Sequence, residues 1–322
     1  MTNASVSPSV APKTSVDEIP WNKHMGQQRS ISDWIVDIII WVLIVAIVAV
    51  VIYPIWFIVV ASFSDQTQVS AGNVTVWPKG FTVAGYIRVF QDSRIWTGYT
   101  NTILYTVFGT ALNLIVTLPA AFGLSRVEFK PRRVILFLFL FTFTMYFAGG
   151  LVPNYLLFKA LGLLDNPLVF ILPGAVSVWN LIIARSFFET SIPEDLHDAA
   201  QIDGLSLFGY FMKIVLPLSS AIIAVIGLYY FVGHWNDYFT GLIYIRESGL
   251  QPLQNVLRDI LLANQTNQLG SGSGGQNVMQ QQQLADQIKY GMIIVSTLPL
   301  LVIYPFLQKY FNKGVMIGAV KG

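Results

Sequence analysis

Six apolar runs, each poor in charged residues, constrain this chain more than any other feature. They occupy residues 38–62, a part of 95–125, a stretch that begins at 134 and fades near 152–157, and residues 166–184, 216–245 and 290–308. A helix needs about 20 apolar residues to cross the hydrocarbon core of a bilayer. Hydrophobic residues make up 54% of the 322 residues and charged residues 11%, which is too apolar for an ordinary soluble surface. We therefore predict an all-α membrane protein with six transmembrane helices.

The distribution of Lys and Arg predicts the orientation of these helices, because basic residues concentrate in cytoplasmic loops. With the N-terminus inside, twelve Lys and Arg residues fall on the inner side and seven on the outer side. Both termini and the loop 186–217 are therefore predicted to be cytoplasmic. The first residues lack the apolar core of a cleavable signal peptide. We expect residues 1–30 to form a flexible cytoplasmic tail and residues 31–322 to form one transmembrane domain.

Two long loops, 63–94 and 246–287, are predicted on the outer side. The first mixes polar and aromatic residues, including Trp77 and Tyr86, which is typical of a loop that is folded outside the membrane. The second contains a glycine-serine stretch, 270–275, and four consecutive glutamines, 280–283. We expect the glycine-serine stretch to be flexible and to be a tolerated insertion with no function of its own.

The loop 186–217 has the pattern of two short helices. The segment 191–194, Ser-Ile-Pro-Glu, has the spacing of a capping box and predicts a helix start. Leu196, Ala199 and Ala200 would share one face, and Gly204 would end the helix. Ser206 would cap a second helix that carries Leu207, Phe208, Tyr210 and Phe211. Such a pair could rest on the membrane surface or dock into a cleft of another protein.

One spacing distinguishes these alternatives. Asp198-Ala199-Ala200 is followed after three residues by Gly204, and Ile214-Val215-Leu216-Pro217 follows nine residues later. The pattern resembles the signature loop of the membrane subunits of binding-protein-dependent ABC importers, in which Glu usually stands at the position of Asp198. The resemblance implies the type I importer permease fold, with a cytoplasmic coupling helix between helices 4 and 5. It also implies that the loop docks an ATPase through Glu194, Asp198, Ala199, Ala200, Asp203, Gly204, Phe208, Ile214, Leu216 and Pro217.

Three further stretches resemble the carbohydrate-importing, maltose-type branch of this family, and its complex-oligosaccharide members in particular. They are 147–153, the residues Trp235-Asn236 with Tyr238-Phe239, and the tail 304–322. The resemblance implies a permease in the bacterial cytoplasmic membrane that forms half of a sugar pore. It further implies a second permease, two cytoplasmic ATPases that use ATP and Mg²⁺, and an extracytoplasmic sugar-binding protein as partners, besides membrane lipid.

The fifth apolar run supplies the polar and aromatic groups that a sugar pathway needs. Its candidate residues are Tyr230, Trp235, Asn236, Asp237 and Tyr238. An ionisable residue near the bilayer, such as Asp237, is costly to bury and is a functional-site hypothesis by default. The alternative is that this group belongs to the aromatic belt at the membrane interface. Asn113 and Asn180 are interpreted as interhelical hydrogen-bonding groups.

The sequence favours a non-catalytic chain. It contains no Gly-x-x-x-x-Gly-Lys-Ser/Thr phosphate loop, so we expect ATP hydrolysis in partner subunits. Its three histidines, at positions 24, 197 and 234, lack ligand spacing, and we predict no metal site, no cofactor bound by this chain and no nucleic-acid partner. A permease for another solute and an ion-coupled secondary transporter remain alternatives. The latter is expected to show internal repeats, and we find no convincing repeat.

Overall fold

The computed structural model describes residues 31–144, 149–270 and 288–305, and every regular element within these ranges is a helix. This confirms the all-α prediction. The chain divides into two compact units, Met1–Ile55 and Trp56–Gly322. The expected tail 1–30 and the glycine-serine stretch from 271 on lie outside the described residues.

In the first unit the described residues all belong to helix α1 (Ile31–Ser62), which continues into the second unit. Nearly every side chain of α1 up to Ile55 is exposed, although most are apolar. A helix that is apolar on all sides requires an apolar surrounding. Its 32 residues span about 48 Å at 1.5 Å per residue, which exceeds the hydrocarbon thickness of about 30 Å.

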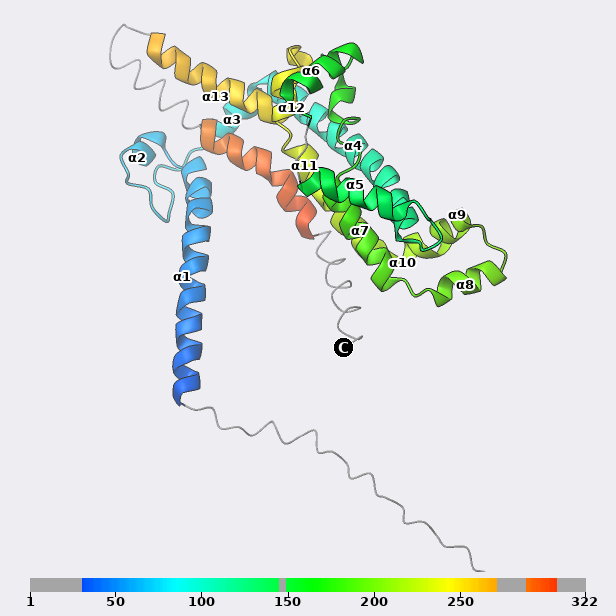
Figure 1. Ribbon diagram of the computed structural model, residues 1–322. Coiled ribbons are helices and arrows are strands. Elements are labelled where there is room, and N and C mark those ends of the chain that lie inside the picture. The colour runs from blue at the N-terminus through cyan, green and yellow to red at the C-terminus, as the bar shows by residue number, and fades with distance from the viewer. Residues whose placement is uncertain (1–30, 145–148, 271–287, 306–322) are drawn as a thin grey trace, which may run out of the picture. The chain divides into compact units, whose positions relative to one another are not determined.

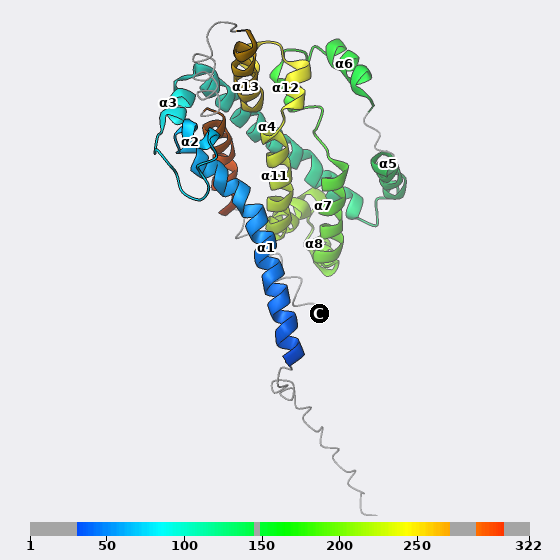
Figure 2. The ribbon, with the colours of Figure 1, turned by 90° about the vertical axis from the view of Figure 1, so that its left-hand side faces the viewer.

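Helix α4 (Ser93–Ser125) organises the second unit. Asp92 caps it by accepting a hydrogen bond from the amide of Arg94. Its main neighbours are α11 (Ser220–Trp235), α7 (Val178–Ser191) and α13 (Leu253–Gly270). In both ribbon views these helices lie along α4, with α13 towards one of its ends (Figure 1 and Figure 2).

The two ends of α4 carry different elements. Helices α3 (Ala84–Gln91), α12 (Phe239–Tyr244) and α13 lie at one end, while α8 (Asp195–Ile202) and α9 (Leu207–Tyr210) lie at the other (Figure 1). Each end has its own buried apolar cluster. Leu118 and Phe122 of α4 pack with α7, α8 and α11, whereas Ile95 packs with α3 and α13. The loop expected to dock an ATPase and the loops expected outside are therefore held at opposite ends of one helix.

The fourth expected span, 166–184, is wrong as a single helix. Residues 167–170 form a 3₁₀ turn, η1 (Pro167–Phe170), and α7 begins only at Val178, capped by the side chain of Ser177. In the gap between η1 and α7, Pro173 lacks an amide proton and Gly174 has no side chain to pack. Neither residue therefore favours a helix there. Helix α7 instead extends through Ser191, seven residues beyond the expected end.

The fifth expected span, 216–245, is interrupted twice. Short pieces η2 (Phe211–Val215, a π-helix) and α10 (Leu216–Leu218) precede α11, and residues Leu207–Leu218 meet Ser220–Trp235 at a bend of 83°. Pro217 cannot donate a backbone hydrogen bond to the preceding turn, which weakens the helix at this point. A second break after Trp235 separates α11 from α12.

The remaining elements follow the expected loops only in part. The loop 63–94 is folded, with α2 (Gln66–Ser70) and α3. The region 246–270 was expected to be a loop but forms η3 (Ser248–Leu250) and the 18-residue α13, because Leu253, Val256, Leu257 and Ile260 bury one face of that helix. In the third apolar run, α5 (Arg132–Thr144) and α6 (Leu151–Ala160) are separate, and Gly149 and Gly150 both have positive φ.

Three described helices are long and apolar enough to cross a membrane: Ile31–Ser62, Ser93–Ser125 and Ile288–Pro305. A fourth is counted if the bent pair forms one span. These helices coincide with the first, second, fifth and sixth apolar runs of the sequence. The described helices thus confirm a helical membrane protein, while the count of six spans stays a prediction.

Candidate functional site

The sequence predicted correctly how helix α8 ends but not how it begins. The predicted capping box is wrong, because Ser191 is the last residue of α7 and the side chain of Glu194 forms no cap. The burial of Phe188 and Ile192 in the apolar cluster carries α7 past the expected boundary. The predicted stop is confirmed: Gly204 has a φ of 74°. The amide of Leu205 donates to the carbonyl of Ala200, 2.9 Å away, as in a Schellman motif.

Two opposite faces of α8 differ in burial. His197 and Ala200 are buried, with exposed fractions of 5% and 2%. Asp198, Ala199 and Ile202 are exposed, and the exposed fraction of Ile202 is 87%. The expectation that Ala199 shares the packed face is therefore wrong, since His197 occupies that face instead. The imidazole packs against the ring of Tyr210, with ring centroids 5.1 Å apart.

Helix α9 divides its apolar residues between the core and the surface. Ser206 caps it as predicted, accepting a hydrogen bond from the amide of Gly209 at 3.1 Å. Tyr210 is buried, and its ring centroid lies 6.0 Å from that of Phe122 on α4. Leu207 and Phe208 remain exposed, Phe208 by 70%. The inner residues anchor the helix pair, and the outer residues remain on its surface.

The other residues of the sequence-derived docking set occupy various positions. Glu194, Asp203, Gly204 and Pro217 are exposed. Ile214 and Leu216 are partly buried and pack against the cluster around Phe122. Pro217 lies two residues before the bend at Ser219 that leads into α11.

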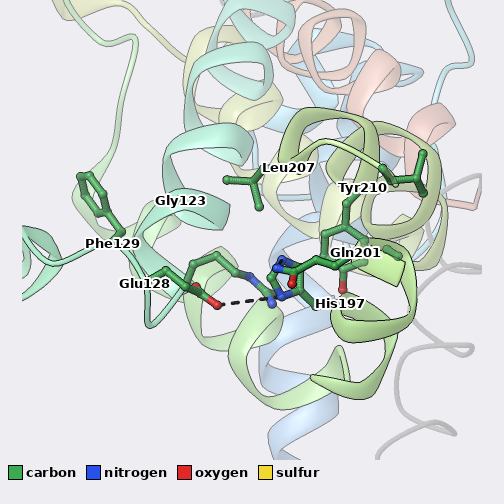
Figure 3. Close-up of a pocket in the computed structure, with 10 residues that line it drawn as sticks. Gly123, Glu128, Phe129, His197, Gln201, Leu207 and Tyr210 are labelled. Carbon is green, nitrogen blue, oxygen red and sulfur yellow. Dashed lines mark hydrogen bonds and ion pairs between the residues drawn. The ribbon is translucent and has the colours of Figure 1, made fainter. Parts of the chain in front are cut away.

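A pocket of about 390 Å³ lies between α8, α9 and the end of α4 (Figure 3). His197 reaches across it, with Nδ1 3.9 Å from a carboxylate oxygen of Glu128. The guanidinium carbon of Arg126 lies 4.9 Å from the Phe122 ring centroid and 5.7 Å from that of Tyr210. Arg126 Nε and the Tyr210 hydroxyl are buried and have no hydrogen-bond partner among the described residues. Sequence reasoning missed this pocket because its walls come from segments about 70 residues apart.

A neighbouring ionic group ties the same end of the molecule together. Arg185 of α7 lies 2.5 Å from Glu189 and donates through Nε to the carbonyl of Leu124 at 3.2 Å. Arg132 lies 3.9 Å from the same carboxylate and donates to the carbonyl of Ser125. These cations have an acidic partner, in contrast to Arg126.

A second pocket, of about 320 Å³, lies between α7, α11 and the turn before α7. Two of the five candidate pathway residues, Tyr230 and Asp237, line it. Trp235 does not, because it is buried among α4, α13 and the helix Ile288–Pro305 and donates to the carbonyl of Ser296 at 3.1 Å. Asn236 and Tyr238 also lie outside the pocket lining. Tyr229 and His234, which belong to the same apolar run, line it as well, and so does Asn180.

Asn113 joins three parts of the second unit by hydrogen bonds. Its amide nitrogen donates to the carbonyl of Gly174 at 2.6 Å, and its amide oxygen lies 2.7 Å from His234 Nε2. This confirms the interhelical role predicted for Asn113. The Tyr230 hydroxyl adds a parallel link, 2.8 Å from Thr117 Oγ1 and 2.9 Å from the amide of Ser177. Tyr230, one of the five candidate pathway residues, is thus held by the scaffold at its polar end.

Within the described ranges, no three His, Asp or Glu side chains are grouped so that they could hold a metal ion.

These features define a helical membrane protein with a pair of short helices, α8 and α9, packed at one end of α4. Residues 95–317 match the family of binding-protein-dependent transport system inner membrane components, and the chain belongs to this family. Its all-helical architecture is that of a type I ABC importer permease.

Relatives in Bacillus subtilis (strain 168) resemble most of the chain. Protein LplC is 40% identical over 274 residues, which cover 85% of this chain and 90% of LplC. The polygalacturonan/rhamnogalacturonan transport system permease protein YtcP is 36% identical, over 89% of this chain and 98% of its own length. The resemblance to ABC permeases of the sugar and oligosaccharide branch is thereby confirmed.

A solved structure has the same fold. The crystal structure of a bacterial ABC transporter involved in the import of the acidic polysaccharide alginate contains a chain that is 32% identical to this one. The match has a TM-score of 0.77 and covers 88% of this chain and 99% of the other.

Proposed function

We propose that this chain is one of two permease subunits of an ATP-driven importer and forms half of the pore for an oligosaccharide. The observation that carries this proposal is the match, along most of both chains, to YtcP and to a subunit of an alginate importer. In this proposal an extracytoplasmic binding protein delivers the sugar. The ATP and Mg²⁺ are bound by two cytoplasmic ATPases, and this chain catalyses no reaction.

The proposed ATPase contact is the exposed surface of α8 and α9. Phe208 and Ile202 expose 70% and 87% of their surface and supply its apolar groups. Asp198, Asp203 and Glu194 are also exposed and add negative charge to this segment. Ala200, Ile214 and Leu216 support this surface from within, because they pack in the protein interior.

The bend at Ser219 gives this docking element a mechanical connection. Movement of α8 and α9 reaches α11 through η2 and α10, and α11 lines the pocket that contains Tyr230 and Asp237. We propose that this pocket belongs to the sugar pathway, with Tyr229 and Asp237 as its contact residues. Trp235 acts through packing, because only 2% of its surface is exposed.

The proposed topology has six spans, with both termini and α8 in the cytoplasm of a bacterial cell. Helices α1, α4, α5, α7 and α11 and the helix Ile288–Pro305 would be the spans. The separation of α8 from α13 along α4 supports placing them on opposite sides of the membrane (Figure 1).

The test is purification of the chain with whatever it binds in its native membrane, followed by an assay of ATP hydrolysis. We expect a second permease and an ATPase to be recovered, and Phe208→Ser to reduce recovery of the ATPase. Trp77→Ser, which alters a residue 73% exposed at the opposite end, is the matched control and should retain it. A chain that purifies alone and does not respond to ATP would contradict the proposal and favour an ion-coupled transporter.

A further inference from the structure

The pocket beside α8 contains a buried positive charge that has no counter-ion in the described part of the chain. Arg126 is 9% exposed, and no carboxylate of the described residues forms an ion pair with it. Its guanidinium lies over the faces of the Phe122 and Tyr210 rings, and its charge also acts on the Tyr210 hydroxyl. A guanidinium stays charged at every physiological pH, and a buried charge is costly unless it is paired. The pocket is therefore electrostatically incomplete.

Two polar atoms in this pocket require the same kind of partner. Arg126 Nε and the Tyr210 hydroxyl are both buried, and neither has a hydrogen-bond acceptor among the described residues. Each can donate a proton, and the guanidinium cannot accept one. A ligand group that satisfies both must therefore present acceptor oxygens, and the charge of Arg126 favours an anion such as a carboxylate or phosphate.

The rest of the pocket is apolar. Phe129, Leu205 and Leu207 form walls around the polar end, and Gly123 leaves space, since a Cβ there would meet no atom within 4 Å. The volume of about 390 Å³ lies in the range of about 300–1,000 Å³ of small-molecule pockets. Glu128 stands at the edge with 59% of its side chain exposed, where solvent screens its repulsion of an anion. Its carboxylate also faces His197.

The position of the pocket on α8 distinguishes a small ligand from an ATPase side chain. His197, Ala200 and Gln201 line the pocket, and they lie on the opposite side of α8 from Ala199 and Ile202. An ATPase that binds the outer face of α8 leaves the pocket on its inner face vacant.

We propose that this pocket binds a small organic anion, a carboxylate or phosphate on a short apolar body, with its acid group on Arg126 and Tyr210. A bound ligand would join the end of α4 to α8 and α9 and hold the docking element in one position. Binding itself follows from the pocket alone, whereas any effect on transport rests on the proposed function of α8.

The experiment uses the purified importer complex in detergent and measures its apparent Tm with hexanoate as the probe. Hexanol and hexylammonium have the same body without the negative charge, and acetate has the charge without the body. We expect a saturable rise in Tm with hexanoate and a much smaller one with the other three compounds. Isothermal titration with hexanoate measures the affinity.

Three variants assign the effect to the pocket. Arg126→Met should weaken hexanoate binding by about 10- to 100-fold, the range expected for losing a charge-assisted hydrogen bond. Gly123→Leu should also abolish binding, by filling space that no protein atom occupies, and it keeps the proposal testable if Arg126→Met does not fold. Lys130→Gln removes an exposed charge of the same loop outside the pocket lining and should bind as the unaltered chain does.

Two results would overturn the proposal: equal responses to hexanoate and hexanol, or full binding of hexanoate by Gly123→Leu. Uptake and ATP hydrolysis are measured separately on the same preparations. Binding of hexanoate without any change in uptake would support the proposed binding site. It would contradict an effect of the bound ligand on transport through α8. Loss of ATPase recovery in Phe208→Ser, by contrast, tests only the proposed function.

Discussion

Asn113 shows how a polar residue is accommodated inside apolar helices. It is completely buried, and both ends of its amide are hydrogen-bonded, to the carbonyl of Gly174 and to His234. Gly109 lies one turn earlier on α4 and makes this possible, since a Cβ there would lie 2.5 Å from His234 Nε2. The glycine provides space for the imidazole.

We therefore expect Gly109→Ala to lower stability by about 1–3 kcal/mol, the usual cost of overpacking. The apparent Tm of the purified protein measures this loss of stability. Gly123→Ala is the matched control on the same helix, because its new Cβ meets no atom within 4 Å. It should be neutral or stabilise by up to about 1 kcal/mol through helix propensity. Equal Tm values for the two variants would show that His234 is not confined by Gly109.

Asp165 provides a pH-dependent prediction at a second single residue. Its φ is 52°, and one carboxylate oxygen accepts hydrogen bonds from the amides of Arg246, at 2.5 Å, and Glu247, at 3.1 Å. These bonds hold the pKa of Asp165 below its ordinary value of 3.8. The stabilisation of the fold by these two hydrogen bonds is therefore complete above the ordinary pKa. It is lost only as the pH falls through the lowered pKa of Asp165.

We expect no contribution of this group to changes in Tm between about pH 5 and 8. Asp165→Ala should lower Tm across that range, because it removes both acceptor bonds and places alanine in the left-handed region. Asp165→Asn keeps an acceptor oxygen and a residue that tolerates this φ, so its Tm should stay closer to that of the unaltered chain. A Tm for Asp165→Asn as low as that for Asp165→Ala would contradict this account.

At the scale of elements, the end of α8 depends on backbone conformation and not on available space. Gly204 has a φ of 74°, yet a Cβ there would meet nothing within 4 Å. The Schellman hydrogen bonds require this conformation, and they turn the chain from α8 towards the cap of α9. The side-chain size at position 204 is therefore secondary to its preference for positive φ.

Gly204→Val should strain the turn by about 1–2 kcal/mol and displace α9 from α8. Under the proposed function, sugar uptake should fall while membrane insertion and basal ATP hydrolysis persist. Gly204→Asn is the matched variant, since Asn tolerates positive φ, and it should retain more uptake than Gly204→Val. ATP-dependent uptake at the normal rate in Gly204→Val would contradict a coupling role for this turn.

At the scale of the whole molecule, the chain contains no cysteine, so any introduced cysteine is unique. Ile202 and Trp77 are 87% and 73% exposed, and the elements that carry them are proposed to lie on opposite sides of the membrane. Ile202→Cys should react with a membrane-impermeant maleimide only in inside-out vesicles, and Trp77→Cys only in intact spheroplasts. Labelling of both variants from one side would contradict the proposed orientation.

The sequence by itself determined the class of this protein and several local features. The apolar runs predicted a helical membrane protein because no other backbone arrangement in lipid satisfies its own hydrogen bonds locally. Gly204 and Ser206 were placed correctly because a helix stop and a helix cap depend on residues a few positions apart. The spacing from Asp198 to Pro217 identified the family for the same reason, since it is contained in 20 consecutive residues.

The tertiary structure alone decided the continuity of the helices and the composition of both pockets. Pro173 and Pro217 interrupt two apolar runs whose composition suits an unbroken span, and α13 forms in a polar region because α4 covers one of its faces. Arg126 and His197 are 71 positions apart yet line one pocket. Such contacts depend on how helices pack over long sequence separations, and hydrophobic periodicity carries information only about the nearest turns.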